Sequence, residues 1–235
     1  GSVLMRSAGC VFNDIVDKNL DKKVTRTKRR PIASGKISVL GASIYIIILC
    51  FIAFLILLQF NLLTVILGFG SMVLAFSYPF MKRITYWPQL FLGLTFNWGI
   101  IMGWTSITNT ISIEPVILYF SAILWTLGYD TIYGVQDLED DEIIGIKSTS
   151  IKFKNNIKFF VTTCYSLCVL CILILFFVMQ INKYFLLLSI LFIMPLIYQI
   201  MIFKLNKPNS CLFAFKLNNL TGMFIFIFLL SFSFA

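Results

Sequence analysis

The stretch Ile37–Leu58 reads ISVLGASIYIIILCFIAFLILL and contains no charged side chain. A helix needs about 20 apolar residues to cross a bilayer, and only helices or closed barrels satisfy their backbone polar groups there. The stretch therefore predicts a transmembrane helix. Similar stretches predict further crossings at 62–80, 89–107, 115–137, 158–180, 184–203 and 213–234. Residues 1–14 are expected to end another helix, so the predicted fold is an all-α, polytopic transmembrane helix bundle.

The composition of the whole chain is typical of a membrane protein. Of its 235 residues, 59% are hydrophobic and 12% are charged, whereas about 25% are charged in an ordinary soluble domain. Apolar segments continue to the end of the chain, which predicts one transmembrane domain over residues 1–235. Histidine is absent, which removes the usual general base at neutral pH. The six cysteines lie mainly in apolar segments and predict packing rather than disulfides.

Lysine and arginine are distributed unevenly between the two expected sides of the membrane. If the helices alternate in direction, the connections at 15–36, 81–88, 138–157 and 204–212 share one side and carry nearly all basic residues, while Lys183 lies on the other. The positive-inside rule places the basic side in the cytoplasm or its organellar equivalent, in a bacterial or mitochondrial inner membrane. Topology and attraction to lipid head groups account for the net charge of +9, so no nucleic-acid or protein partner is inferred.

Carboxylates are not required by topology, yet they gather on the same side. Asn13, Asp17 and Asp21 recur at intervals of four, as do Asp137 and Asp141, so each set lines one stripe of a helix. Like charges at this spacing repel, and carboxylate and amide oxygens suit Mg²⁺. The two sets predict a magnesium site in two parts.

Basic residues surround the acidic sets and suit phosphate oxygens. They are Arg26, Lys28, Arg29, Arg30, Lys82, Arg83 and Lys147. Magnesium with a basic rim would neutralise the charge that develops on a leaving diphosphate. The simpler interpretation is a solvated loop whose charges pair with one another.

Polar and aromatic residues within the apolar segments are further candidates. Asp130 lies inside the 115–137 stretch, and intramembrane acids are costly and usually functional; it would orient an acceptor, take up a proton or pair with a cation. Asn97 is a weaker case. Tyr129 and Tyr133 would shield a carbocation from water, although aromatic residues in membrane helices more often face lipid.

At these residues the sequence resembles the UbiA superfamily of intramembrane prenyltransferases. The family motif NDxxDxxxD is matched at Asn13, Asp14, Asp17 and Asp21, and RTKRRPIASGKIS (26–38) follows it. The second motif, DxxxD, is matched at Asp137 and Asp141 within YDTIYGVQDLEDDEIIGIKSTS (129–150). These blocks, with YPFMKRITYWPQLFLG (78–93), look most like the 4-hydroxybenzoate polyprenyltransferases of ubiquinone biosynthesis.

The resemblance implies a nine-helix bundle, of which about eight helices are represented, and two Mg²⁺ ions held by the two motifs. It implies transfer of a polyprenyl group from polyprenyl diphosphate to 4-hydroxybenzoate within the lipid bilayer. The expected catalytic residues are Asp130, Asp17 and Asp137. The expected substrate-binding residues are Arg30, Lys82, Arg83, Lys147, Asn97, Tyr129 and Tyr133.

One departure from the family pattern concerns the start of the chain. Family members begin with another helix and a basic residue before the position of Gly1, so the chain is expected to be N-terminally incomplete. Two alternatives remain: a prenyltransferase for another acceptor, such as dihydroxynaphthoate or haem, and a non-enzymatic transporter that binds a divalent ion.

Overall fold

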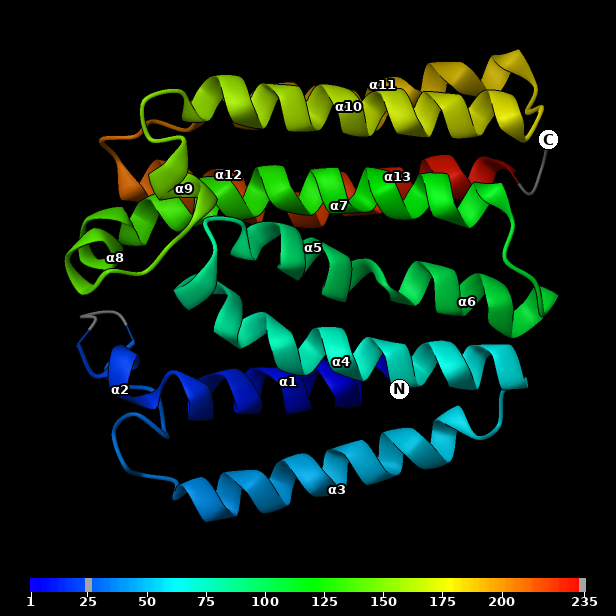
Figure 1. Cartoon of the computed structure of the whole chain (residues 1–235). Coiled ribbons are helices and arrows are strands. Elements are labelled where there is room, and N and C mark those ends of the chain that lie inside the picture. Colours follow the sequence, from blue (N-terminus) through cyan, green and yellow to red (C-terminus); the bar gives the residue numbers. More distant parts are fainter. Residues whose placement is uncertain (24–26, 233–235) are drawn as a thin grey trace. The chain divides into compact units, whose positions relative to one another are not determined.

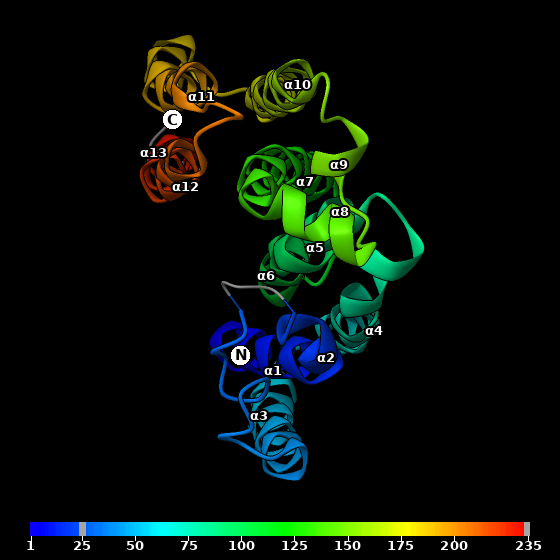
Figure 2. The same ribbon diagram turned by 90° about the vertical axis from the view of Figure 1, so that its left-hand side faces the viewer.

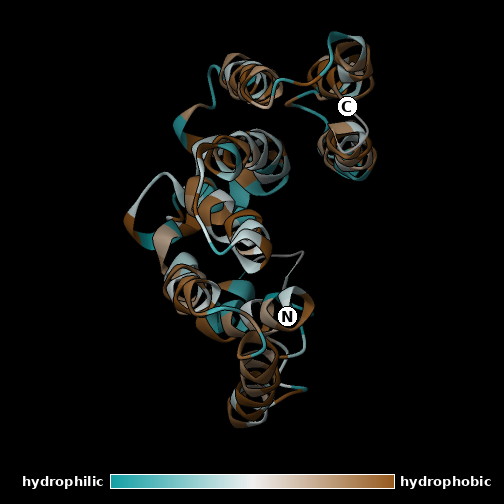
Figure 3. Ribbon diagram, turned by 90° about the vertical axis from the view of Figure 1, so that its right-hand side faces the viewer, coloured by the Kyte–Doolittle hydropathy of each residue, from teal (hydrophilic) through white to brown (hydrophobic). Residues whose placement is uncertain are grey.

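The computed structural model describes residues 1–23 and 27–232. Arg26 and the last two residues of the expected 213–234 helix lie outside these ranges. The described residues are helical throughout their regular structure, and seven segments are long and apolar enough to cross a membrane, which confirms the predicted fold class. Hydrophobic residues dominate these helices (Figure 3).

The chain divides into two compact units, and each is described by itself. Unit 1 comprises residues 1–111 and 139–147, and unit 2 comprises residues 112–138 and 148–235. The expectation of one domain over the whole chain stays a prediction.

The helices of unit 1 come mainly from the first half of the chain (Figure 1). Those of the first half are α1 (Ser2–Val16), α2 (Lys18–Asp21), α3 (Val39–Leu57), α4 (Leu62–Ile84), α5 (Pro88–Asn97) and α6 (Gly99–Thr108). Helix α1 packs against both α3 and α4, and α4 packs against α5 and α6. Ala8, Ile46 and Leu49 form the buried contact between α1 and α3.

Local sequence explains where the long helices of unit 1 begin. The Ser38 hydroxyl accepts a hydrogen bond from the Gly41 N–H (3.1 Å), and the Asn61 side chain accepts one from the Thr64 N–H (3.0 Å). Such side-chain caps satisfy donors that the first turn leaves unpaired. They explain why the expected segments at 37–58 and 62–80 begin within two residues of α3 and α4.

One expected helix of unit 1 is interrupted. The segment at 89–107 was predicted as continuous, but it forms α5 and α6 with a break at Trp98. The Trp98 indole Nε1 donates to the Leu67 carbonyl of α4 (2.9 Å). An apolar pattern predicts that a segment crosses the membrane, but it does not specify such a tertiary hydrogen bond.

Unit 2 contains the longest apolar helices of the second half of the chain. Its elements are α7 (Ile113–Gly134), η1 (Val135–Asp137), α9 (Thr149–Lys152), α10 (Ile157–Val178), η2 (Lys183–Leu188), α11 (Ser189–Ile202), α12 (Pro208–Lys216) and α13 (Asn218–Ser231). Figure 2 looks along the axes of α7, α10 and α11. The core gathers buried aromatic residues from several of these helices, including Tyr165, Phe176, Phe192 and Phe228. Helix α8 (Leu138–Ile144) begins at the last residue of the first segment of unit 2 and continues in unit 1.

Candidate functional site

The first acidic motif lies where α1 ends and α2 begins, within unit 1. The Asp17 N–H donates to the Asn13 carbonyl (2.9 Å), and the Asp21 N–H donates to the Asp17 carbonyl (2.8 Å). The four-residue hydrogen-bond spacing therefore continues through the motif, as the sequence pattern requires for one stripe. Asp17 and Asp21 are nevertheless buried, at 1% and 6% exposure. Two carboxylates are thus held away from water at the junction of α1 and α2.

The buried Asp17 carboxylate is neutralised by two cations from the last turn of α4. Lys82 Nζ contacts Asp17 Oδ2, and Arg83 Nη2 lies 3.5 Å from Asp17 Oδ1. Arg83 Nη2 also donates to the Val16 carbonyl (2.8 Å), one of the acceptors left open at the end of α1. A buried carboxylate is costly unless it is paired, so these contacts make the burial of Asp17 possible.

Arg30 pairs with two further carboxylates of the first motif, those of Asp14 and Asp21. Its Nη1 atom lies 2.9 Å from Asp14 Oδ1 and 3.1 Å from Asp21 Oδ2. Asp14 lies outside the seven membrane-spanning segments, and partial burial raises the pKa of its carboxyl above the ordinary range against the lowering effect of Arg30. The neighbouring charges of Asp21 and Asp17 raise this pKa further. Unit 1 therefore brings together Arg30, Lys82 and Arg83 around the first motif, and their role in binding phosphate stays a prediction.

Lys147 is the last residue of the second segment of unit 1, in the loop after α8, and contacts the end of α4. Its N–H donates to the Lys82 carbonyl (2.9 Å), and its Nζ donates to the Ile84 carbonyl (3.1 Å) and lies 5.6 Å from the Tyr86 ring centroid. Gly145 has φ = 74°, a conformation that glycine adopts at little cost. Lys147 thus orders the backbone beside Lys82, and its ammonium group satisfies a terminal carbonyl of α4.

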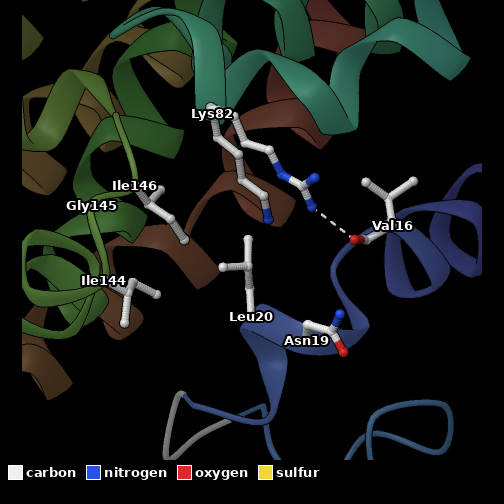
Figure 4. Close-up of a pocket in the computed structure, with 8 residues that line it drawn as sticks. Val16, Asn19, Leu20, Lys82, Ile144, Gly145 and Ile146 are labelled. Atoms are coloured by element: carbon white, nitrogen blue, oxygen red, sulfur yellow. Dashed lines mark hydrogen bonds between the residues drawn. The ribbon is translucent and has the colours of Figure 1, made fainter.

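A cavity of about 370 Å³ lies between α2, the end of α4 and this loop. Its lining residues are Val16, Asn19, Leu20, Lys82, Arg83, Ile144, Gly145 and Ile146. Figure 4 shows the Lys82 side chain pointing into it and the hydrogen bond from Arg83 to Val16. One apolar wall and two cations make this a suitable space for an anionic group.

The second acidic motif crosses the boundary between the units along the chain. Asp137 is the last residue of η1 and belongs to unit 2, whereas Asp141 lies in α8 and belongs to unit 1. The Ile146 N–H donates to the Asp141 carbonyl (2.9 Å) and closes the turn after α8.

The donor set of the first motif suits magnesium by its chemistry, because an amide and carboxylates supply hard oxygen ligands. Within residues 1–23 and 27–232, no three His, Cys, Asp or Glu side chains gather closely enough to hold a metal ion. Instead, Lys82, Arg83 and Arg30 contact the carboxylates that magnesium would use.

Asp130, Tyr129 and Tyr133 lie on the last turns of α7 in unit 2. Tyr129 makes edge contacts with Trp125 (5.6 Å between centroids) and Phe215 (5.8 Å). The Tyr133 ring lies 4.5 Å from that of Phe215. The two tyrosines therefore belong to one aromatic cluster between α7 and α12. Asp130, which follows Tyr129 in the sequence, is half-buried.

A buried polar network behind this cluster was missed by the sequence analysis. The Tyr165 hydroxyl donates to Gln199 Oε1 (2.7 Å), and Gln199 Nε2 donates to Thr221 Oγ1 (3.0 Å) and Asn218 Oδ1 (3.3 Å). The Trp125 indole donates to the same Asn218 oxygen (3.0 Å). The network joins α7, α10, α11 and α13. Gln199 in the middle of an apolar stretch was the available signal, because buried amides need partners.

Asn97 and Arg6 lie on the α1–α5 side of unit 1. Asn97 Nδ2 donates to the Gly93 carbonyl of its own helix (2.9 Å). Arg6, which the sequence analysis did not select, stands over the Phe96 ring at 5.0 Å. It precedes Asn13 by seven residues and Asp17 by eleven, about two and three helical turns, so Arg6, Asn13 and the C-cap residue Asp17 lie along one stripe that follows α1 to its end. The signal for Arg6 was a cation within an apolar segment.

Comparisons with known proteins agree with this architecture. The sequence model described as the UbiA prenyltransferase family matches residues 1–229. The chain is 43% identical over 232 residues to the mitochondrial 4-hydroxybenzoate polyprenyltransferase of Bos taurus, covering 97% of this chain and 62% of that protein. It is 40% identical over 227 residues to a 4-hydroxybenzoate octaprenyltransferase of Coxiella burnetii, covering 97% and 79%.

Two solved structures share the fold. A UbiA homolog from Aeropyrum pernix K1 in its apo form has a TM-score of 0.81 at 21% identity, covering 96% of this chain and 86% of that one. A UbiA homolog from Archaeoglobus fulgidus bound to DMAPP and Mg²⁺ has a TM-score of 0.72 at 19% identity, covering 99% and 85%.

Proposed function

Because the chain belongs to the UbiA prenyltransferase family, we propose that it acts in transferring a polyprenyl group from polyprenyl diphosphate to the aromatic ring of 4-hydroxybenzoate, a step of ubiquinone biosynthesis. The observation that carries the proposal is the 43% identity, over 97% of this chain, to a protein named for this reaction. In this proposal the protein lies in a bacterial or mitochondrial inner membrane as a multi-pass membrane protein. Its basic loops face the cytoplasm or the equivalent compartment of the organelle.

Magnesium is the proposed cofactor. Asn13, Asp17 and Asp21 would hold one ion, and Asp137 and Asp141 would hold another. Bound magnesium neutralises the charge that develops on the departing diphosphate. The structure with DMAPP and Mg²⁺ from a protein of the same fold supports this assignment.

The basic residues on the first motif bind the diphosphate oxygens. Lys82, Arg83 and Arg30 already contact the carboxylates of the motif, so a diphosphate arriving there would meet donors that are in place before the reaction. Donors arranged in advance stabilise developing charge with little reorganisation. Lys147 supports them by ordering the Lys82 backbone.

The acceptor requires a separate cation for its carboxylate. Lys82 and Arg83 are expected to bind substrate, but both contact Asp17. Arg6 is the better candidate, because its guanidinium stands over an aromatic ring two turns before Asn13. Asn97 is the proposed neutral contact to the acceptor.

The reaction is an electrophilic aromatic substitution. The bond between the allylic carbon and the diphosphate oxygen breaks, and its electron pair leaves with the diphosphate. The ring carbon beside the phenolic hydroxyl then bonds to the allylic carbon, and Asp130 takes the proton that this ring carbon loses. Tyr129 and Tyr133 exclude water from the cation through their packed aromatic cluster.

The test uses membranes carrying the full-length protein, labelled 4-hydroxybenzoate and a polyprenyl diphosphate. We expect prenylated product that disappears in the Asp17→Ala, Asp137→Ala double variant and on chelation of magnesium. Glu114→Ala, which removes a carboxylate at the start of α7, should retain activity. Product that persists in the double variant under chelation would refute the mechanism. Preferential use of dihydroxynaphthoate or haem in a competition assay would instead show that the acceptor is not 4-hydroxybenzoate.

A further inference from the structure

Unit 2 carries a group of lysines at the end of its bundle where α9, the start of α10 and the α11–α12 connection lie (Figure 1). We call this group the lysine patch. It consists of the exposed residues Lys158, Lys204 and Lys207.

Tertiary contacts bring the two segments of the patch together. Lys158 Nζ lies 5.4 Å from the ring centroid of Phe203, which is fully buried and precedes Lys204. The Lys204 N–H donates to Ser210 Oγ (2.9 Å), and Ser210 Oγ donates to the Lys207 carbonyl (2.7 Å). These bonds hold the α11–α12 turn compact, and the contact with Phe203 places Lys158 beside the start of that turn.

The charge of the patch is not balanced by nearby acids in the sequence. Residues 148–158 and 203–216 contain no Asp or Glu, whereas Arg30, Lys82 and Arg83 of unit 1 each contact a carboxylate. Lys158 is also the second residue of α10, where the helix dipole disfavours a cation. An anion bound at the patch would offset both the mutual repulsion and this unfavourable position.

The surface next to the patch is apolar. Phe159 is 76% exposed and Met201 is 69% exposed, and each lies on a membrane-spanning helix within a few residues of a patch lysine. Cations at the ends of membrane helices, with exposed apolar side chains beside them, match the order of phosphate and acyl chain in a phospholipid.

We propose that the lysine patch binds the head groups of anionic phospholipids in the adjoining leaflet. This function is separate from catalysis. It also goes beyond the positive-inside rule, which explains the orientation of a protein in the membrane but does not involve binding of a particular lipid. Lys158, Lys204 and Lys207 supply the phosphate contacts, and Phe159 and Met201 contact the acyl chains.

The experiment measures lipid binding to the purified full-length protein by native mass spectrometry. Phosphatidylglycerol and phosphatidylcholine with identical acyl chains are titrated against the wild type, K158Q/K204Q/K207Q, and the matched control K22Q/K23Q/K36Q, which removes the same charge from unit 1. A basic residue near an anionic surface contributes about fivefold in affinity. We expect the patch variant to lose its preference for phosphatidylglycerol by at least about tenfold, while the control retains it.

Three further measurements test this interpretation. K158R/K204R/K207R keeps the charge and should keep the preference for phosphatidylglycerol. If the glutamine triple variant does not fold, the single variants K204Q and K207Q should each lower that preference a few-fold. Glycerophosphoglycerol and inorganic diphosphate should not displace the lipid at millimolar concentration; displacement would show a site for soluble phosphates instead. Equal binding of both lipids by the wild type, or equal loss in the patch and control variants, would overturn the proposal.

Discussion

Gly128 is the position where one added carbon should disturb the packing of unit 2 most directly. A Cβ atom there would lie 2.4 Å from Tyr165 Cε1 and 2.7 Å from Cδ1. The Tyr165 ring is 2% exposed, and its hydroxyl donates to Gln199 Oε1 at 2.7 Å. The ring therefore cannot move aside without giving up a buried hydrogen bond.

The expected effect of Gly128→Ala follows from three contributions. Overpacking of a core costs about 1–3 kcal/mol, and leaving a buried acceptor unpaired costs about 1–3 kcal/mol. Alanine gains about 1 kcal/mol over glycine within a helix. The free energy of unfolding should therefore fall by roughly 1–5 kcal/mol.

The assay is equilibrium unfolding in mixed micelles, followed by far-UV circular dichroism. Gly103→Ala is the matched control, because a Cβ atom at Gly103 meets nothing within 4 Å, and it should be neutral or stabilising. Adding Tyr165→Leu to Gly128→Ala should recover part of the loss, since coupled neighbours are not additive. If Gly128→Ala unfolds at the same denaturant concentration as Gly103→Ala, the reasoning about this contact is wrong.

Three other predictions concern polar and charged groups. Gln199→Leu should lower the free energy of unfolding by about 2–4 kcal/mol, because it leaves buried partners unpaired, whereas the exposed Gln59→Leu should change it by less than about 0.5 kcal/mol in the same unfolding assay. Lys82→Met should destabilise the protein by about 2–4 kcal/mol by breaking a buried ion pair, and adding Asp17→Asn should restore most of this in thermal unfolding; no recovery would contradict the pairing. Magnesium at 100 times its Kd should stabilise the wild type by about 2.7 kcal/mol for each occupied site, seen as a higher Tm, and the Asp17→Asn, Asp21→Asn double variant should lose the contribution of the first motif.

The membrane-crossing segments were predicted from the sequence because their physical cause is local. About 20 apolar residues must satisfy their own backbone in lipid, and the segments at 37–58, 62–80 and 158–180 correspond to α3, α4 and α10. The break at Trp98 was not predicted, because it accompanies a hydrogen bond to Leu67, 31 residues earlier.

The sequence by itself also determined that Asn13, Asp17 and Asp21 share one stripe, since a helix places every fourth residue on the same face. Only the tertiary structure decided which cations meet these carboxylates. Lys82 reaches Asp17 across 65 positions of the chain, and Tyr165 reaches Gln199 across 34. Helical periodicity specifies which face of a helix a side chain occupies. The partner of that side chain depends on which helices pack together, because packing is decided by the summed burial and hydrogen bonding of whole helices.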